Sequence, residues 1–249
     1  MHAVTPELLP AEWPAPRGVH VFTTCRRGGV SRGPYASMNV GAHVGDHPEH
    51  VARNRALLRA RLPGEPFWLE QVHGTVVAEP GRDLGVPVAD AAVTTRPNTV
   101  LAVLTADCLP VVLAADDASA VAIVHAGWRG LSAGVIDAAV SRLSAPPDRL
   151  LAHLGPAIGP AWYEVGADVR AAFVDVDPEA ATAFHDTSPG KWYADLYTLA
   201  RRRLAALGVS RVHGGGHCTF TDHARFFSFR RDGITGRMAT LAWIERGGR

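Results

Sequence analysis

Three consecutive apolar segments near the middle of the chain restrict its fold most strongly. Residues 100–105, 111–114 and 120–124 consist almost entirely of aliphatic and β-branched side chains. Continuous runs of this kind, without polar alternation, predict strands that are buried on both faces. Residues 131–143 follow with one apolar face at helical spacing and predict a helix. A strand followed by a polar turn and a helix places reactive groups at the end of the strand.

The rest of the chain also contains predicted helices and strands. Apolar residues at helical spacing predict helices over residues 47–62, 167–173 and 194–207. Shorter apolar runs predict strands over residues 18–24, 67–77 (as two strands joined by a bend), 150–155, 209–213, 226–230 and 238–244. Because hairpin-like strand pairs occur together with crossover helices, we predict a layered α/β domain with mixed β-sheets.

The length and composition predict one folded unit. The chain has 249 residues, of which 47% are hydrophobic and 20% charged, and no Ser/Gly-rich linker divides it. A single α/β domain can take up this length. We therefore predict one domain over residues 1–249, with residues 1–17 as an N-terminal extension.

Charge and cysteine content limit the partners and the compartment. The 25 basic and 24 acidic side chains nearly cancel, so we predict no nucleic acid, no membrane and no obligate protein partner. No uncharged apolar stretch reaches the roughly 18 residues of a membrane span. The N-terminus lacks the pattern of a secretory signal. Three scattered cysteines are too few for a disulfide framework, so we predict a cytoplasmic protein.

His73, Cys108 and His125 are the candidate metal ligands and catalytic residues. Each lies next to a turn at the end or edge of a predicted strand, so the three can converge. Two imidazoles and a thiolate suit Zn²⁺ or copper, and three protein ligands leave one coordination position for water or substrate. Their spacing matches none of the compact zinc-finger patterns.

Two other interpretations of these residues stay open on the sequence alone. A lone cysteine after an apolar strand is commonly a small buried hydrophobe, and a lone histidine in a turn is commonly polar surface. Alternatively, Cys108 is a nucleophile with His125 as its base, and Asp107 or another carboxylate orients the imidazole.

Arginines near turns are the candidates for anion binding. Arg27 precedes a Gly-Gly pair, and Arg129 lies just before a predicted helix, where backbone N–H groups also point outward. Arg230 lies in residues 226–233, which combine aromatic rings with guanidinium groups. The competing interpretation is that the glycines only satisfy turn geometry and the phenylalanines only fill the core.

Five motifs in a fixed order resemble those of the YfiH family. They are residues 71–74 (QVHG), 106–111 (ADCLPV), 125–130 (HAGWRG), 155–166 (GPAIG followed by YEVG) and 227–232 (FSFRRD). The resemblance also covers residues 28–31 (GGVS) and 35–41 (YASMNVG), where Asn39 joins Arg27, Arg129 and Arg230 as a candidate substrate-binding residue. The sequence departs from the family pattern at Cys25. An Arg is expected close to this position.

The resemblance implies a fold, a metal and an activity. The family, also called laccase-domain proteins, multicopper polyphenol oxidases and peptidoglycan editing factors, implies an α/β/β/α sandwich. It includes purine nucleoside phosphorylases that also deaminate adenosine. In this sequence His73, Cys108 and His125 match the metal-ligand positions of the family, which implies a catalytic zinc.

We therefore expect a zinc-dependent phosphorylase that takes adenosine, inosine or methylthioadenosine together with phosphate, and that also deaminates adenosine. One alternative is a copper-dependent polyphenol oxidase, although most of the 12 histidines are scattered in polar segments rather than grouped to hold several coppers. Another alternative is a Cys-dependent amide hydrolase that acts in peptidoglycan editing.

Overall fold

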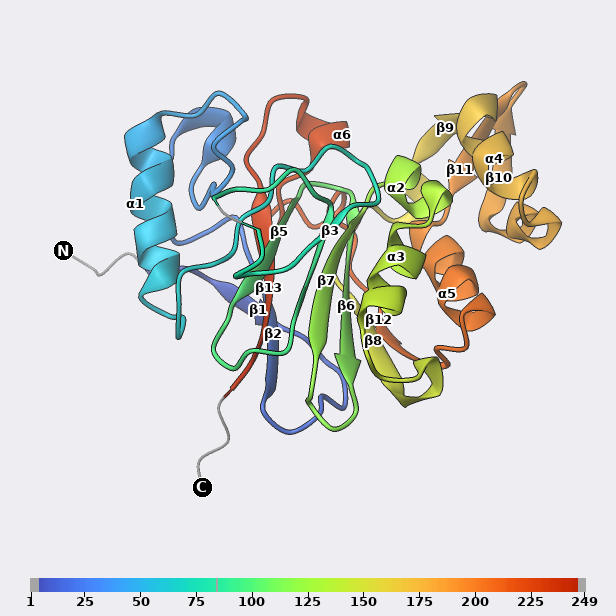
Figure 1. The fold of residues 1–249 in the computed structure, drawn as a ribbon. Helices are drawn as coiled ribbons and strands as arrows, with labels where there is room; N and C mark the ends of the chain where they lie inside the picture. The colour runs from blue at the N-terminus through green and yellow to red at the C-terminus, as the bar shows by residue number, and fades with distance from the viewer. Residues whose placement is uncertain (1–4, 84, 246–249) are drawn as a thin grey trace.

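Two β-sheets lie face to face in the centre of the molecule (Figure 1). The computed structural model describes residues 5–83 and 85–245. The first sheet has the order β1 (Leu8–Pro10), β2 (Val19–Thr24), β13 (Met238–Ile244) and β5 (Leu101–Thr105). The second has the order β12 (Arg211–Gly214), β8 (Leu150–Leu154), β6 (Leu109–Ala115), β7 (Val121–Ala126), β4 (Ala91–Thr94) and β3 (Val77–Ala78).

The pairing within the sheets is mixed. The first sheet is antiparallel throughout, whereas the second combines parallel pairs at both edges, β12 with β8 and β3 with β4, with antiparallel pairs between them. This confirms the prediction of mixed sheets. Strand β1 lies within the segment predicted as an N-terminal extension, which therefore contributes an edge strand.

Helices cover the outer face of each sheet and complete an α/β/β/α sandwich. Helix α1 (Pro48–Arg59) lies on the first sheet, and α2 (Trp128–Ala133), α3 (Val135–Arg142) and α5 (Leu196–Ala206) lie on the second (Figure 1). The three largest clusters of buried side chains each occupy one interface: α1 with the first sheet, sheet with sheet, and the second sheet with its helices. The predicted fold class is confirmed.

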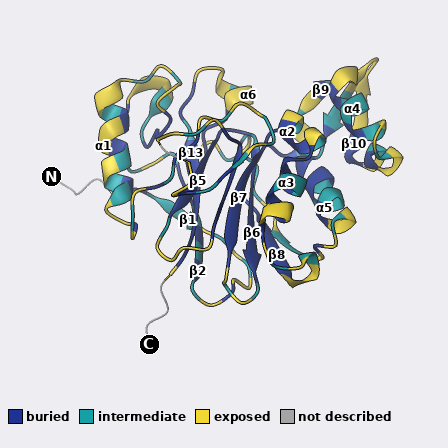
Figure 2. Cartoon of the chain, in the orientation of Figure 1, coloured by how far each residue is buried: buried dark blue, intermediate teal, exposed yellow. Residues whose placement is uncertain are grey.

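The central strands are apolar on both faces because both faces are covered. In β6, Val111 and Leu113 pack toward the helices, whereas Val112 and Ala114 pack toward the other sheet. Side chains of a strand alternate between its two faces, so each interface takes every second residue. Figure 2 shows these strands as buried and the outward side of α1 as exposed.

Two predicted elements differ in the structure. The predicted helix over residues 131–143 is divided into α2 and α3, because Gly134 adopts a left-handed backbone with φ of +93° that ends α2. The predicted strand over residues 226–230 is wrong. There, the hydroxyl of Ser228 accepts the N–H of Arg231 and caps the short helix α6 (Phe229–Asp232).

Other predictions are confirmed with small changes at their ends, and some elements were not predicted. Residues 67–77 form isolated bridges to neighbouring segments and only the beginning of β3, rather than two strands. A small third sheet, not predicted, has the order β10 (Phe184–Ser188), β11 (Lys191–Ala194) and β9 (Glu164–Gly166), and lies beside the predicted helix α4 (Ala167–Val174).

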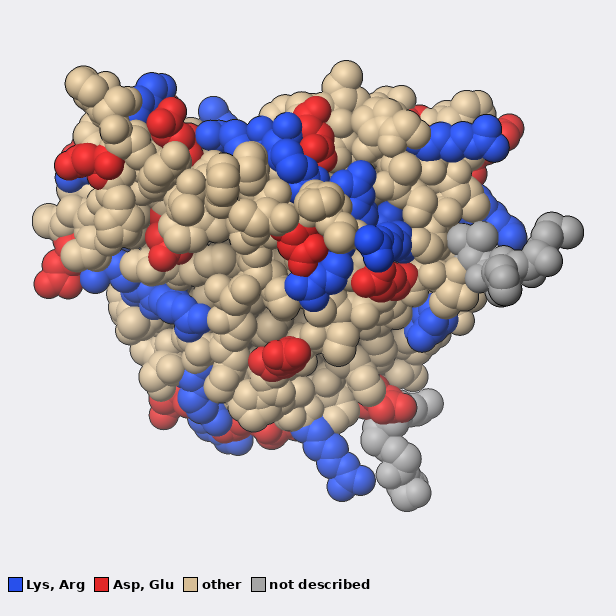
Figure 3. All heavy atoms as spheres, turned by 180° about the vertical axis from the view of Figure 1, so that it is seen from behind, with Lys and Arg blue, Asp and Glu red and all other residues tan. Residues whose placement is uncertain are grey.

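The surface carries charges of both signs. On the face seen in Figure 3, acidic side chains lie among the basic ones. In the described part of the chain, no helix has the length and apolar character needed to cross a membrane.

Candidate metal centre

His73, Cys108 and His125 come together at one end of the space between the two sheets. His73 lies in the loop before β3, Cys108 in the turn between β5 and β6, and His125 near the end of β7. The ligand atoms that these three side chains offer all lie within 4.8 Å of one another. The Sγ of Cys108 is 3.8 Å from the Nε2 of His73. We refer to these three residues as the metal centre.

Strand alternation explains the direction of His125. Val121 and Ile123 of β7 pack into the core between the sheets, and His125 continues the same face two residues further on. At this point the apolar core ends, so the imidazole meets Cys108 and His73 rather than another aliphatic side chain. The rings of His73 and His125 lie edge to face with their centroids 4.8 Å apart.

Asp90, which no sequence pattern singles out, holds two of the three candidate ligands. Its Oδ1 lies 2.8 Å from Nδ1 of His125, and both side chains are buried. Its carboxylate also accepts the backbone N–H groups of Val72, His73 and Gly74. The bond to Nδ1 leaves Nε2 of His125 for the metal centre, as in the carboxylate–histidine pairs of many metal sites. The only local signal is an acidic residue directly before the apolar run of β4.

Asp107 fixes the turn that carries Cys108. It adopts φ of +95°, its Oδ1 accepts the hydroxyl of Thr219 at 2.6 Å, and its Oδ2 accepts the backbone N–H of Arg230 at 2.6 Å. These two bonds join the turn to the C-terminal part of the chain. Asp107 therefore anchors the Cys108 turn, and the carboxylate on the imidazole of His125 is that of Asp90.

Gly127 allows the side chains of the centre to approach the backbone. A Cβ atom built on Gly127 would lie 2.7 Å from Cδ2 of His73 and 3.2 Å from Sγ of Cys108. Contacts at 2.7 Å are shorter than van der Waals packing permits. A side chain at Gly127, at the beginning of α2, would therefore displace His73.

Electrostatics favour an ionised thiol. Burial alone would raise the pKa of the Cys108 thiol, but His125 and His73 lower it to about 6. Burial would lower the pKa of His125, but Cys108 and Asp90 raise it to about 9. A thiolate is the form of cysteine that binds metals.

The donor set fits one small divalent ion. Zinc binds sulfur at about 2.3 Å and nitrogen at about 2.0–2.1 Å, so a tetrahedral ion would separate the two donors by about 3.6 Å. The distance of 3.8 Å between Cys108 and His73 is close to this value. Two nitrogens and one sulfur suit zinc or copper, and leave a fourth position for water or substrate.

A cavity of about 290 Å³ opens beside the metal centre. Besides the three candidate ligands it is lined by His43, Gln71, Leu104, Thr105, Ala106, Phe229 and Arg237. The Gln71 amide binds the backbone of Leu104 through both its oxygen and its nitrogen, which fixes one wall. Phe229 is 57% exposed although it is a large apolar side chain, so its ring is free to contact a ligand.

The four predicted substrate-binding residues do not line this cavity. Asn39 is fully buried, and its amide oxygen accepts the backbone N–H groups of Gly41 and Arg237. Arg27 is exposed at a separate hollow beside Ser37. Asn39 thus acts on the site through the backbone, and a direct role toward substrate stays a prediction for both residues.

Arg129 and Arg230 lie near Tyr163. The guanidinium of Arg129 lies over the ring of Trp128. That of Arg230 lies over the ring of Tyr163, and its Nη1 donates to the carbonyl of Glu164. Burial and the nearby Cys108 raise the pKa of Tyr163, whereas Arg230 and Arg129 lower it. Their roles toward substrate also stay predictions.

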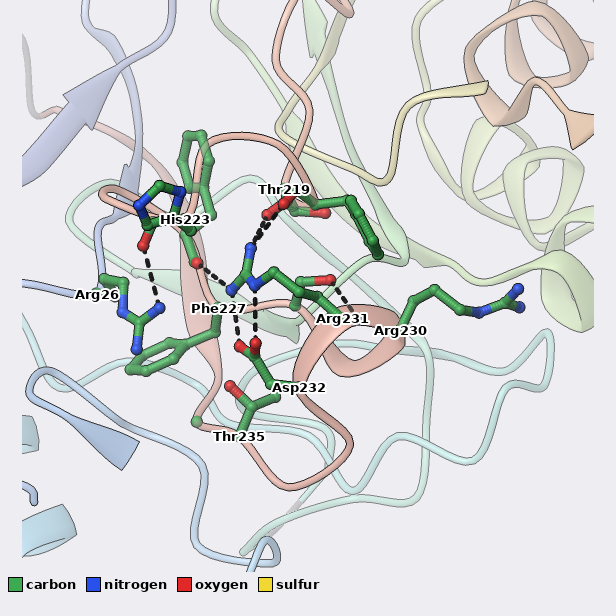
Figure 4. A network of polar contacts seen from close by, with 12 residues as sticks. Arg26, Thr219, His223, Phe227, Arg230, Arg231, Asp232 and Thr235 are labelled. Atoms are coloured by element: carbon green, nitrogen blue, oxygen red, sulfur yellow. Dashed lines mark hydrogen bonds and ion pairs between the residues drawn. The ribbon is translucent and has the colours of Figure 1, made fainter. Parts of the chain in front are cut away.

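The neighbouring Arg231 is structural. Its guanidinium donates to the carbonyls of Thr219, Phe220 and Phe226, and pairs with Asp232 (Figure 4). In the same view the side chain of Arg230 points away from this network. Two adjacent arginines of one motif therefore lie in different environments, which the sequence does not distinguish.

Next to Cys25, where the sequence departs from the family pattern, Arg26 is partly buried. Cys25 is buried, and its backbone N–H donates to the carbonyl of Glu7. The guanidinium of Arg26 lies 4.9 Å from the centre of the Phe227 ring and donates to backbone carbonyls, one of them that of His223 (Figure 4). Arg26 thus joins the N-terminal loop to the aromatic segment.

Comparison with known proteins supports one family over nearly the whole chain. Residues 19–245 match the family model described as multi-copper polyphenol oxidoreductase laccase. The chain is 50% identical to purine nucleoside phosphorylase YfiH of Shigella flexneri, over 96% of this chain and 99% of that protein. It is 50% identical to purine nucleoside phosphorylase PA4543 of Pseudomonas aeruginosa, over 95% of this chain and 98% of that protein.

Solved structures show the same architecture. The crystal structure of Neisseria meningitidis protein NMB0706 matches with a TM-score of 0.93 and 49% identity, over 96% of this chain and 99% of that chain. The crystal structure of YlmD from Geobacillus stearothermophilus matches with a TM-score of 0.87 and 34% identity, over 94% of each chain.

Proposed function

The chain belongs to the family described as multi-copper polyphenol oxidoreductase laccase, and from this membership we propose that it is a metal-dependent purine nucleoside phosphorylase. Relatives that are about half identical over nearly their full length carry that name. The observation that carries the proposal is the convergence of His73, Cys108 and His125 at the wall of a ligand-sized cavity.

The reaction joins phosphate to the sugar and releases the base. An oxygen of inorganic phosphate forms a bond to the anomeric carbon of the ribose while the bond from that carbon to the purine nitrogen breaks. The electron pair of the broken bond goes to the purine, which takes up a proton, and ribose 1-phosphate remains. Positive charge develops on the sugar and negative charge on the base, so groups that stabilise these charges accelerate the reaction.

The cavity has the features that this chemistry needs. The exposed ring of Phe229 can stack on a purine, because offset stacking is favourable for aromatic pairs. The side chains of Leu104 and Ala106 make the wall beside the metal centre apolar, which excludes water and strengthens electrostatic interactions. A bound divalent ion would supply Lewis-acid stabilisation of negative charge.

Zinc is the metal we propose, with copper as the alternative, because His73, Cys108 and His125 form a donor set that both ions accept. We extend the proposal to adenosine, inosine and methylthioadenosine as substrates and to deamination of adenosine, in which water replaces the amino group at C6 and ammonia leaves. The free thiols of Cys25, Cys108 and Cys218 support a reducing compartment such as the cytoplasm.

A second candidate is a cysteine hydrolase. The thiol of Cys108 contacts the imidazole of His125, which in turn contacts the carboxylate of Asp90. This arrangement of thiol, imidazole and carboxylate is the one that activates a nucleophilic cysteine. The polyphenol oxidase implied by the family description has less support. Among the described residues, the centre of three ligands is the one group suited to a metal, whereas a multicopper enzyme needs ligands for several ions.

The decisive experiment is incubation of the purified protein with adenosine or inosine, with and without phosphate. We expect release of adenine or hypoxanthine together with ribose 1-phosphate, dependent on phosphate and proportional to bound metal. His73→Ala and Cys108→Ala should lose both metal and activity. Intact nucleosides, combined with metal-independent amide hydrolysis that thiol alkylation abolishes, would establish the hydrolase instead.

A further inference from the structure

Arg237 lies in the wall of the cavity, immediately before β13, and its backbone is fixed on both sides. Its N–H donates to Oδ1 of Asn39 at 2.9 Å, and its carbonyl accepts the N–H of Val40 at 3.3 Å. The same amide oxygen of Asn39 also accepts the N–H of Gly41. The position from which the Arg237 side chain starts is thus set by a buried polar network.

The first part of the side chain is held by a close contact. A Cβ atom on Gly41 would lie 2.8 Å from Cγ of Arg237, so the arginine packs directly against the glycine backbone. At the other end, the guanidinium carbon lies 5.8 Å from the centre of the Phe229 ring. The direction of the side chain along the cavity wall is therefore defined before any ligand binds.

Arg237 carries its charge without an acidic partner among the residues that the structure describes. Within that part of the chain, the hydrogen bonds of its guanidinium run from Nη1 to the carbonyls of Thr235 and Gly236, both at 3.1 Å. Other arginines differ: Arg231 pairs with Asp232 and Arg203 with Asp137. A partly buried charge without a directly paired group of opposite sign is unfavourable.

The Arg237 side chain is partly buried, so its charge is partly removed from solvent. Burial lowers the pKa of Arg237, whereas the nearby Cys108 and Asp107 raise it. Burial and the Arg237 charge lower the pKa of His43, a second residue of the same cavity wall. A ligand that brings negative charge to this wall would therefore be stabilised by Arg237.

We propose that Arg237 binds the inorganic phosphate that attacks the nucleoside, with His43 beside it as a further hydrogen-bonding group. This inference rests on the proposed function, because phosphorolysis requires an oxyanion in the same cavity as the nucleoside. Guanidinium groups bind phosphate oxygens through two parallel charged hydrogen bonds. Within the described residues the Arg237 guanidinium donates only through Nη1, so its Nε and Nη2 donors are available for such a pair.

The other arginines near the metal centre are less suited to this task. Arg230 is bound to the carbonyl of Glu164 and lies over Tyr163, and Arg129 lies over Trp128. Neither lines the cavity. Because they flank the centre at Tyr163, they provide the competing location for an anion and belong in the test.

The test measures binding of inorganic phosphate to the metal-loaded full-length chain by calorimetry, and the KM for phosphate and for inosine. Loss of charged hydrogen bonds should raise the Kd of Arg237→Gln for phosphate about tenfold or more. The KM for phosphate should rise equally, and the KM for inosine less than twofold. Arg237→Lys should recover part of the loss. The matched control is Arg82→Gln, an exposed arginine paired with Glu79.

A second measurement uses the wild-type protein and therefore remains informative if the Arg237→Gln variant does not fold. Phenylglyoxal modifies accessible arginines, and mass spectrometry locates the modified residue. We expect phosphate to protect Arg237 and to leave Arg82 reactive. Equal modification of Arg237 with and without phosphate would overturn the inference.

The outcomes separate the two proposals. Wild-type phosphate affinity in folded Arg237→Gln, or a loss confined to Arg129→Gln or Arg230→Gln, would overturn the role of Arg237 while leaving phosphorolysis intact. Failure of the wild-type protein to cleave any purine nucleoside would overturn the proposed function. Phosphate binding lost in Arg237→Gln would then still support an oxyanion site at this residue.

Discussion

Nδ1 of His125 lies 2.8 Å from Oδ1 of Asp90, and the same carboxylate accepts the backbone N–H of His73. Two candidate ligands that are far apart along the chain are thus oriented by one buried acidic side chain. The third, Cys108, is positioned separately through Asp107 and its bond to Thr219. The centre therefore depends on two carboxylates that are not themselves candidate ligands.

Replacing Asp90 should weaken metal binding more than it disturbs the fold. Asn has nearly the same shape, but its amide brings N–H donors to a place where His125 and three backbone N–H groups require an acceptor. We expect Asp90→Asn to lower metal affinity about 10- to 100-fold. Competition with a chromophoric chelator measures the affinity, and Asp116→Asn, on the surface, is the control. Unchanged affinity in the folded variant would contradict this role.

Gly127→Ala should displace the ligands directly. The new methyl group would lie 2.7 Å from Cδ2 of His73, and the backbone of Gly127, with φ of −65°, itself accepts alanine. The effect should therefore be steric, with substoichiometric metal and reduced nucleoside cleavage. Gly216→Ala is the matched control, since a Cβ there meets no atom within 4 Å. If both variants bind one equivalent of metal equally tightly, the close approach at Gly127 is not required.

Tyr197 should contribute to stability through its hydroxyl. The hydroxyl donates to the carbonyl of His217 at 2.6 Å and accepts the buried N–H of Ala157 at 2.8 Å. Tyr197→Phe leaves that N–H unsatisfied, so the free energy of unfolding should fall by about 1–3 kcal/mol in urea titrations. Tyr193→Phe is the control, because its hydroxyl forms no hydrogen bond within the described residues. Equal stability of the two variants would count against the proposed contribution.

The sequence pattern predicts the buried strands and the mixed α/β class well because their signals are local, whereas the α/β/β/α sandwich is implied only by the family resemblance. The apolar runs that became β5, β6 and β7 need no partner to be recognised, since a strand covered on both faces is apolar at every position. The predicted helix over residues 131–143 fails only at Gly134, where a left-handed conformation interrupts a correct amphipathic pattern. The predicted strand over residues 226–230 is wrong because two buried aromatic residues, Phe226 and Phe227, give the same local signal in a loop as in a strand.

The site is predicted only in part because its positioning residues act over long distances. His73, Cys108 and His125 are recognisable by residue type beside turns. The role of Asp90 can be recognised only in the folded chain, where the pairing of β4 with β7 brings its carboxylate to His125. Arg237 is hidden for a similar reason: it precedes β13, whereas its network partner Asn39 lies near the other end of the chain. Neither relationship leaves a periodic pattern in the sequence.

The last prediction concerns acid stability and His153. This side chain is buried between the sheets near Trp13, and its Nδ1 has no hydrogen-bond partner within the described part of the chain. Burial, together with His213 and His217, lowers its pKa to about 4. An unfolded histidine titrates near 6.5, so between these values the unfolded chain binds a proton that the native chain does not.

Stability contributed by the neutral His153 should therefore be complete above about pH 6.5 and lost as the pH falls toward about 4. The full difference corresponds to about 3 kcal/mol. His153→Phe removes the titration while keeping an aromatic ring beside Trp13. We expect the free energy of unfolding, measured in urea at pH 7.5 and pH 4.5, to fall more in the wild type than in the variant. All other titrating groups are common to the two proteins. If the free energy of unfolding falls equally in both, His153 binds a proton as readily in the native state as in the unfolded chain.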